Sequence, residues 1–396
     1  MRTCLPFLLV LAGCPNGGEP IGDTSNGSGI QVFADSMVVL AYNDLGMHCM
    51  NQDFSELMIL PPYNTLHAQV VRRGGEEPSI VTSGITIAYS IPGNTTSVTK
   101  TNFWDYVKPL LGTSLEPDVG LAGNGLAGTM TTTGTNDWSV LGIPITPITD
   151  AGDLDAYQLA KVTVTSGGTV TAQTAAVVPV SWEIRCDLCH VGTGGVTPYG
   201  AILASHDTLH GTTLVDQKPV LCGACHGQPA LGLTGVKGNP TLSGAIHSAH
   251  ASRMSAISVD PPCYACHPGE VTSCLRDVMA SAGLGCIDCH GDMAAVGDPG
   301  RAPWVDEPRC DDCHDKAGYE YEQPGTLYRD SKGHKGVHCA ACHGSPHAVQ
   351  PTTEANDNVQ AEALQGHTGT IDTCEVCHGG ETPDDPFPHA FSGGED

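Results

Sequence analysis

A five-residue motif, Cys-x-x-Cys-His, occurs seven times after residue 185 and constrains this chain more than any other feature. With 18 cysteines and 18 histidines in 396 residues, residue frequencies alone predict about 0.04 matches, so the repeat is not random. The motifs are Cys186/Cys189/His190, Cys222/Cys225/His226, Cys263/Cys266/His267, Cys286/Cys289/His290, Cys310/Cys313/His314, Cys339/Cys342/His343 and Cys374/Cys377/His378. They use 14 of the 18 cysteines.

The spacing within the motif predicts covalent haem. Two thiols three residues apart lie on one side of a helical turn, where they can reach the two vinyl groups of one porphyrin. The next histidine then faces the iron and binds it from the proximal side, which is the attachment pattern of c-type haem. Zinc sites and disulfides are the alternatives, but neither requires a histidine after every cysteine pair. We therefore expect seven covalently bound haems.

The other histidines are candidates for the distal side of the irons. Eleven of the 18 lie outside the motifs, and seven low-spin irons need seven distal ligands. Nine of the eleven lie in the haem region: His206, His210, His247, His250, His334, His338, His347, His367 and His389. We expect mostly bis-histidine ligation, which favours low reduction potentials.

The spacing of these histidines along the sequence distinguishes the distal candidates from one another. His206 and His210 are four residues apart, and His247 and His250 are three apart, so each pair can share a helix face. His338 directly precedes the sixth motif, where the geometry is tight.

Two intervals, 268–285 and 291–309, contain no histidine. A haem bound in either interval must take its distal ligand from a distant segment of the chain, use Met279 or Met293, or keep an open sixth position.

The N-terminus predicts export. One arginine and a short apolar run are typical of a signal peptide and too short to cross a bilayer. The run ends in Leu-Ala-Gly-Cys14, which resembles the lipobox of bacterial lipoproteins, in which the cysteine carries the lipid. We expect a lipoprotein signal peptide over 1–13 and a flexible tether over 14–29. In that family Pro15 after the cysteine implies the outer membrane, and an ordinary signal peptide is the alternative.

Residues 30–182 contain no haem motif and are rich in Thr, Val, Gly and Pro. Residues 79–91 are β-branched and partly alternating, and 161–165 and 169–173 flank Ser-Gly-Gly, a hairpin pattern. These patterns predict an all-β, sandwich-like domain over 30–182. Residues 183–396 then form a heptahaem cytochrome c domain with short helices, long loops and porphyrins as its core.

One segment of the β region contains several potential metal ligands. His48, Cys49 and His67, with two neighbouring methionines, could form a soft-metal or copper site. Alternatively, His48 or His67 contacts a haem, Cys49 pairs with Cys274, or all are buried structural residues.

Charge restricts the partners. The formal net charge is −26, which argues against nucleic acid, since phosphate binding needs clustered cations. Residues 186–396 hold 27 acidic and 10 basic residues, so basic patches on redox partners or metal cations are the complementary surfaces.

Several blocks resemble multihaem c-type cytochromes of metal-respiring and sediment bacteria. They are YNDLGMHCMNQDFSELMILPPYNTLHAQVV, HDTLHGTTLVDQKPVLCGACHG, CHGDMAAVG, APWVDEPRCDDCH, LYRDSKGHKGVHCAACHGSPHA and ANDNVQAEALQGHTGTIDTCEVCHG. The resemblance implies a lipid-anchored electron carrier in periplasmic or extracellular respiration, with redox proteins, metal oxide or another extracellular acceptor as partners. The alternatives are an oxidoreductase acting on a small nitrogen or sulfur oxyanion at one open haem, or a β domain that captures a partner for the haems. Pentahaem nitrite reductases have a lysine in one motif, whereas all seven motifs here end in histidine.

Overall fold

The computed structural model describes residues 21–25, 29–74, 77–314, 321–323, 325–379 and 389. The predicted signal peptide 1–13 and the predicted lipid site Cys14 lie outside these residues. No helix in the described ranges has the length and apolar content needed to cross a membrane.

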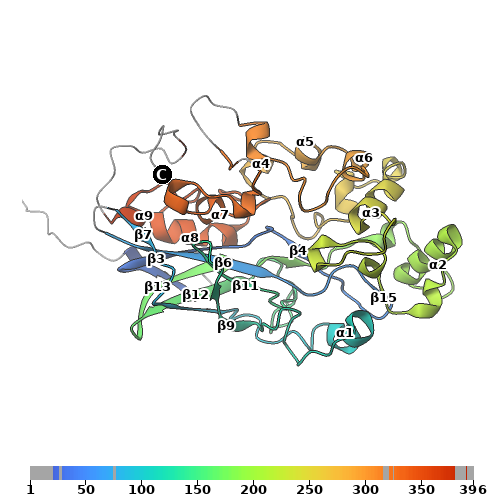
Figure 1. Ribbon diagram of the computed structural model, residues 1–396, viewed down its shortest axis with the longest axis horizontal. Helices are drawn as coiled ribbons and strands as arrows, with labels where there is room; N and C mark the ends of the chain where they lie inside the picture. The colour runs from blue at the N-terminus through green and yellow to red at the C-terminus, as the bar shows by residue number, and fades with distance from the viewer. Residues whose placement is uncertain are drawn as a thin grey trace, which may run out of the picture.

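The N-terminal part is β-rich, as predicted, and consists mainly of two antiparallel sheets (Figure 1). The first sheet runs in the order β1 (Ile21–Ser25), β2 (Gln31–Ala34), β13 (Thr169–Val177), β12 (Leu159–Ser166), β8 (Thr86–Ser90) and β9 (Ala127–Thr129). The second runs β10 (Thr131–Thr132), β11 (Trp138–Leu141), β6 (Thr65–Arg72) and β3 (Met37–Tyr42), with β7 (Ser79–Ile80) paired to β6. The helix α1 (Phe103–Leu111) lies between β8 and β9 in the chain.

The predicted hairpin is confirmed, because β12 and β13 pair antiparallel on either side of Gly167 and Gly168, both with positive φ. The β-branched run 79–91 is not one strand. It is divided into β7 and β8, and Gly84 between them has φ +75°, which ends extended pairing. Strand β1 lies within the range predicted as a tether and pairs with β2, since an edge strand needs only backbone hydrogen bonds to join a sheet.

Two short parallel pairs complete the strands. β4 (His48–Cys49) pairs with β14 (Val180–Ser181), just before the first motif. β5 (Leu57–Met58) pairs with β15 (Val220–Leu221), which directly precedes the second motif. The loop region 48–58 is thus joined by backbone pairing to the start of the haem-motif region.

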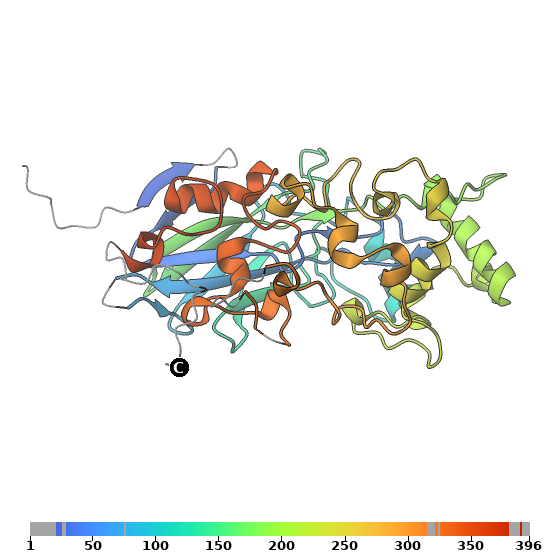
Figure 2. The same cartoon turned by 90° about the horizontal axis from the view of Figure 1, so that it is seen from above.

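The rest of the chain forms short helices and loops, as predicted. The α-helices are α2 (Pro198–His210), α3 (Leu242–His250), α4 (Val278–Ser281), α5 (Cys286–His290), α6 (Met293–Val296), α7 (Cys339–His343), α8 (Ala355–Gln365) and α9 (Glu375–His378). The 3₁₀ turns are η1 (Cys186–Leu188), η2 (Leu214–Gln217), η3 (Cys222–Ala224), η4 (Pro229–Leu231), η5 (Met254–Ala256), η6 (Pro262–Ala265), η7 (Cys310–Asp312), η8 (Tyr328–Asp330) and η9 (His334–Gly336). In Figures 1 and 2, α7, α8 and α9 lie over the sheets, whereas α2 lies at the opposite end of the long axis.

Two cores hold this arrangement together. The first joins the facing sides of the two sheets and includes Val39, Val70 and Val162. The second joins the other side of the β part, including Val38 and Leu40, to Ala340, Ala341, Leu364 and Val376. Because Ala340 and Ala341 are the middle residues of the sixth motif, that motif is packed directly on the β part.

Candidate haem-binding sites

Each motif forms one helical turn. In five motifs the backbone N–H of the histidine donates to the carbonyl of the first cysteine at 2.8–3.0 Å. The other two motifs are the α-helices α5 and α7. Every cysteine in the described part of the chain is free of a disulfide. Each motif therefore presents two free thiols and an imidazole from one turn, as thioether attachment of a porphyrin requires.

The second cysteine of four motifs is exposed. These four are Cys189, Cys225, Cys289 and Cys313, whereas the first cysteine of each of the same motifs is partly buried. The turn explains the difference at Cys225. The turn η3 starts where β15 joins the second motif to the β part, and Cys225 lies one turn farther from that attachment.

Cys189 follows the same geometry in the first motif. Its backbone N–H donates to the carbonyl of Cys186 at 3.3 Å, and that of Cys225 donates to the carbonyl of Cys222 at 3.2 Å. Each exposed thiol therefore stays in the same turn as its partly buried partner. Cys189 and Cys225 remain predicted attachment sites, with their thiols exposed on the protein side.

Six of the seven motif histidines face a second histidine at a nearly constant distance. The ring-centroid pairs are His190–His250 (6.1 Å), His226–His206 (6.2 Å), His267–His247 (6.1 Å), His290–His347 (5.9 Å), His378–His334 (6.1 Å) and His343–His389 (5.7 Å). A metal–imidazole bond of about 2 Å, plus about 1 Å from nitrogen to ring centroid, places two rings on one metal about 6 Å apart. The spacing fits a single iron between each pair.

Hydrogen bonds also leave the correct nitrogen free in several of these rings. The Nδ1 atoms of His226, His247 and His250 lie 3.1, 2.8 and 2.7 Å from the carbonyl oxygens of Pro240, Ser243 and Ile246. Because a carbonyl only accepts, each Nδ1 carries the proton, which leaves the Nε2 lone pair available to a metal.

The helix α3 supplies distal candidates to two motifs. Thr241 caps its N-terminus by accepting from the backbone N–H of Gly244. His247 faces the third motif and His250 faces the first. The two histidines thus share one helix, as their spacing predicts, but serve different motifs. The helix α2 similarly presents His206 to the second motif.

The fourth motif faces His347, from a segment distant in the sequence. The ring of His347 hydrogen-bonds to the backbone of Leu45, and its backbone φ is +61°. Gly46 beside it has φ +75°, and a Cβ there would overlap the carbonyl oxygen of Pro346. Burial, and then the neighbouring His290, lower the pKa of His347 to about 4. The partly buried ring is therefore neutral, which is the form that binds metal.

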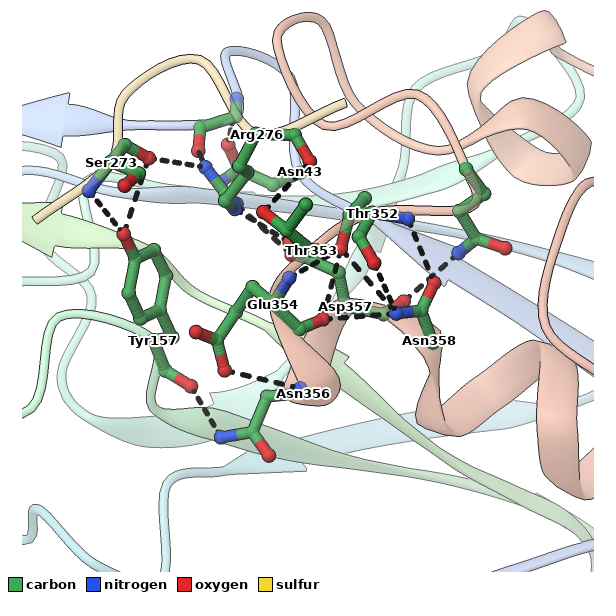
Figure 3. A network of polar contacts seen from close by, with 12 residues as sticks. Asn43, Tyr157, Ser273, Arg276, Thr352, Thr353, Glu354, Asn356, Asp357 and Asn358 are labelled. Carbon is green, nitrogen blue, oxygen red and sulfur yellow. Dashed lines mark hydrogen bonds and ion pairs between the residues drawn. The ribbon is translucent and has the colours of Figure 1, made fainter. Parts of the chain in front are cut away.

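Arg276 fixes the segment that carries His347 (Figure 3). Its guanidinium binds both carboxylate oxygens of Asp357, with Nε–Oδ2 at 2.5 Å and Nη2–Oδ1 at 3.0 Å. Nη1 also donates to the carbonyl of Gly46 at 2.7 Å, and the guanidinium lies 4.9 Å from the ring centroid of Tyr157. The backbone N–H of Arg276 donates to the carbonyl of His347 at 3.0 Å. One buried arginine therefore joins the β part to both haem segments around the fourth motif.

A cavity of about 720 Å³ lies between the fourth and fifth motifs. Its lining includes Cys289, His290, Arg301, Arg309 and Tyr328. The volume is in the range of cofactor sites, and Cys289 and His290 of the fourth motif line it. The residues present here therefore fit the group that the motifs imply.

The motifs adjoin one another in a line. Burial is the main cause of the raised pKa of several motif thiols, and a thiol of another motif adds to it. The pairs are Cys186–Cys222, Cys186–Cys266, Cys189–Cys266, Cys289–Cys313, Cys310–Cys339 and Cys342–Cys377. The thiols of Cys263 and Cys286 are hydrogen-bonded to each other. Thiols are therefore neighbours between the second and first, first and third, third and fourth, fourth and fifth, fifth and sixth, and sixth and seventh motifs.

Three distal candidates are not placed opposite a motif histidine. His210 packs on His206 at 4.7 Å between ring centroids. His338 lies 3.4 Å from the carbonyl of Thr135 through Nε2. His367 is half-exposed and near Asp372.

The segment around His48 takes a structural role in the β part. His48 Nε2 lies 3.0 Å from Asp44 Oδ1, and His67 Nδ1 lies 2.8 Å from Asp137 Oδ2. Within the described ranges, no three His, Cys, Asp or Glu side chains converge as a metal site. Burial, and then Cys274, raise the pKa of the Cys49 thiol, so the two cysteines are near each other and protonated.

The sequence alone did not indicate the roles of Arg276, Leu45 or Tyr321. The ring of Tyr321 faces His314 of the fifth motif at 5.6 Å between centroids. No pattern marks these residues, because each acts through a contact between distant segments. No known protein family and no curated protein gives a significant match to this chain.

Proposed function

We propose that this chain is a heptahaem c-type cytochrome that carries electrons along its long axis. The observation that carries the proposal is the constant 5.7–6.2 Å spacing of six motif histidines from a second histidine. Bound haem supplies reversible one-electron chemistry at its iron. With a histidine on both sides, such an iron has no position for a substrate, which suits a carrier.

The linear order of the motifs supports transfer from end to end. The second motif lies near α2 at one end of the long axis, and the seventh contains α9 near the other (Figure 1). An unbranched row of sites has two termini, where partners can exchange electrons. The acidic surface of residues 186–396 favours a partner with a basic patch or a metal-oxide surface.

The experiment is a haem count combined with spectroscopy on the mature protein. We expect seven haems per chain, predominantly low-spin spectra and full reduction by a low-potential dye. The control is the double variant Cys222→Ala/Cys225→Ala, which removes one attachment site and is expected to retain six haems. Fewer than seven haems in the unaltered protein, or a majority of high-spin irons, would contradict the proposal.

The proposed location is the outer membrane, through a lipid on Cys14, facing the periplasm or the cell exterior. The support is the lipobox resemblance of the N-terminal sequence. Replacing Cys14 with Ser is expected to move the protein from the membrane fraction to the soluble fraction. An unchanged distribution would refute the lipid anchor.

A second candidate function is an oxidoreductase for a small nitrogen or sulfur oxyanion. Such an enzyme needs one iron with an open sixth position. The fifth motif favours this reading, since within the described ranges its histidine has a ring contact with Tyr321 and with no second histidine.

A further inference from the structure

Cys49 and Cys274 are the two cysteines of the described residues that lie outside the seven motifs. The proposed haem attachment therefore has no use for either thiol. Cys49 lies in β4 of the β part, and Cys274 lies between the third and fourth motifs. Both are thiols in the structure. They are far apart in the sequence, so only the fold can bring them together.

Strand pairing directs the side chain of Cys49 toward the segment that carries Cys274. The strands β4 and β14 are parallel, with Cys49 opposite Ser181, and residues opposite each other in a sheet point to the same face. The hydroxyl oxygen of Ser181 lies 3.0 Å from that of Thr272, two residues before Cys274. The Cys49 thiol therefore points to the side of β14 that Thr272 covers.

Contacts on the other side of each cysteine also hold the two segments together. The Nη1 atom of Arg276 donates to the carbonyl of Gly46 at 2.7 Å and lies 3.4 Å from the carbonyl oxygen of Cys274. Gly46 is three residues before Cys49, and Arg276 is two residues after Cys274. The backbone N–H of Cys274 donates to the carbonyl of Pro268 at 3.1 Å, which fixes its own turn. The two cysteines therefore lie between two points at which their segments are joined.

The surroundings of the two thiols limit what the pair can do. Burial, and then Cys274, raise the pKa of the Cys49 thiol, so the two side chains are within electrostatic reach of each other. Burial also raises the pKa of Cys274 to about 11. Within the described ranges no three potential ligands converge on a metal ion, and a protonated thiol is a poor nucleophile. Two neighbouring thiols of this kind are suited to one covalent step, which is oxidation to a disulfide.

We infer that Cys49 and Cys274 form a disulfide that joins the β part to the segment between the third and fourth motifs, and that the structure shows its reduced form. One S–S bond forms and two S–H bonds break, so the pair loses two electrons and two protons. An external disulfide, in glutathione or in an exported thiol oxidoreductase, takes them up and is reduced to two thiols. Because exchange needs a thiolate, the step precedes burial of the thiols, during folding. The proposed export of the chain supplies an oxidising compartment, whereas the proposed haems are not required.

The test is peptide mapping of the mature, full-length protein without reductant. Free thiols are blocked with iodoacetamide in denaturant before digestion, and the peptides are identified by mass spectrometry. We expect one cross-linked pair that joins the peptides of Cys49 and Cys274 and is separated by dithiothreitol. Alkylated Cys49 and Cys274 as the main products would overturn the inference. Alkylated motif cysteines beside an intact cross-link would instead refute the proposed haem attachment.

Thermal unfolding with matched variants tests whether the bond joins the two parts of the fold. Loss of a cross-link that closes so long a loop should lower the melting temperature by about 5 °C in Cys49→Ser. Cys49→Ser/Cys274→Ser should lose no more than the single variant, because either change removes the bond. Dithiothreitol should destabilise the unaltered protein but leave the double variant unchanged. An equal response of both proteins to dithiothreitol would overturn the joining role of the disulfide.

Discussion

Arg276 offers a quantitative test of how the β part supports the haem segments. The substitution Arg276→Met keeps most of the side-chain volume but leaves the Asp357 carboxylate, which is 8% exposed, without its cation. Removing one partner of a buried, bidentate pair destabilises proteins by about 3–5 kcal/mol. The bond to the carbonyl of Gly46 is lost as well. We expect a loss of about 4 kcal/mol, which for a chain of this size lowers the melting temperature by about 5 °C.

The assay is thermal unfolding followed by circular dichroism, with the Soret spectrum recorded in parallel. Because the backbone of Arg276 binds the carbonyl of His347, loosening this segment should also increase the high-spin fraction at the fourth haem. The matched control is Arg185→Met, since the Arg185–Glu270 pair is partly exposed. Loss of such a surface pair is expected to leave the melting temperature almost unchanged, because solvent screens it.

A double variant separates charge from packing. Arg276→Met/Asp357→Leu removes both charges, and replacing a buried pair by apolar residues is often neutral. We expect it to recover most of the lost stability. If the double variant is as unstable as the single one, or if Arg276→Met is no worse than Arg185→Met, the reasoning about the buried pair is refuted.

Three further predictions follow from named contacts. The Glu183 carboxylate accepts from the backbone N–H groups of residues 270–272; burial alone would raise its pKa, but these bonds hold it below the ordinary value. The ionised carboxylate therefore stabilises the fold above about pH 4.3, and this stabilisation is lost as the pH falls through the lower pKa of the folded state. Glu183→Gln should lower the melting temperature at pH 7 but change it little at pH 3. An equal loss at both pH values would contradict this. Gly46→Ala should destabilise the protein and raise the high-spin fraction at the fourth haem, because a Cβ would overlap Pro346; a native Soret spectrum and melting temperature would disprove the close approach. His250→Ala should open the first haem and add one carbon monoxide per chain, whereas an unchanged stoichiometry would show that His250 is not its distal ligand.

The sequence predicted best what depends on neighbours in the chain. The motif turns and the hairpin of β12 and β13 are local, so their residue types and spacing suffice. Nine distal candidates could be named from composition, and six of them face motif histidines in the structure. Their assignment to motifs could not be predicted, because His347 reaches the fourth motif only through the approach of Gly46 and Pro346, two segments far apart in the chain.

Two other features could not be predicted for related physical reasons. Strand β1 was missed, since pairing at a sheet edge is made by the backbone and leaves little trace in side-chain type. The exposure of Cys189 and Cys225 could not be predicted, because the five-residue motif is the same at every site. Which side of a turn is covered depends on the distant segments that pack on it, and the residues of the motif do not determine those segments.

The facing histidine pairs have a consequence for how the protein folds. Two imidazoles bound to one iron act as a crosslink between the segments that carry them, and a crosslink stabilises mainly by restricting the unfolded chain. The pairs His290–His347 and His190–His250 would each close a long loop in this way. In the proposed holoprotein, a region with short helices and few aromatic side chains would draw much of its rigidity from such metal bonds. If the proposed function holds, haem loading is a folding step for this half of the chain, whereas the two sheets have an apolar core of their own.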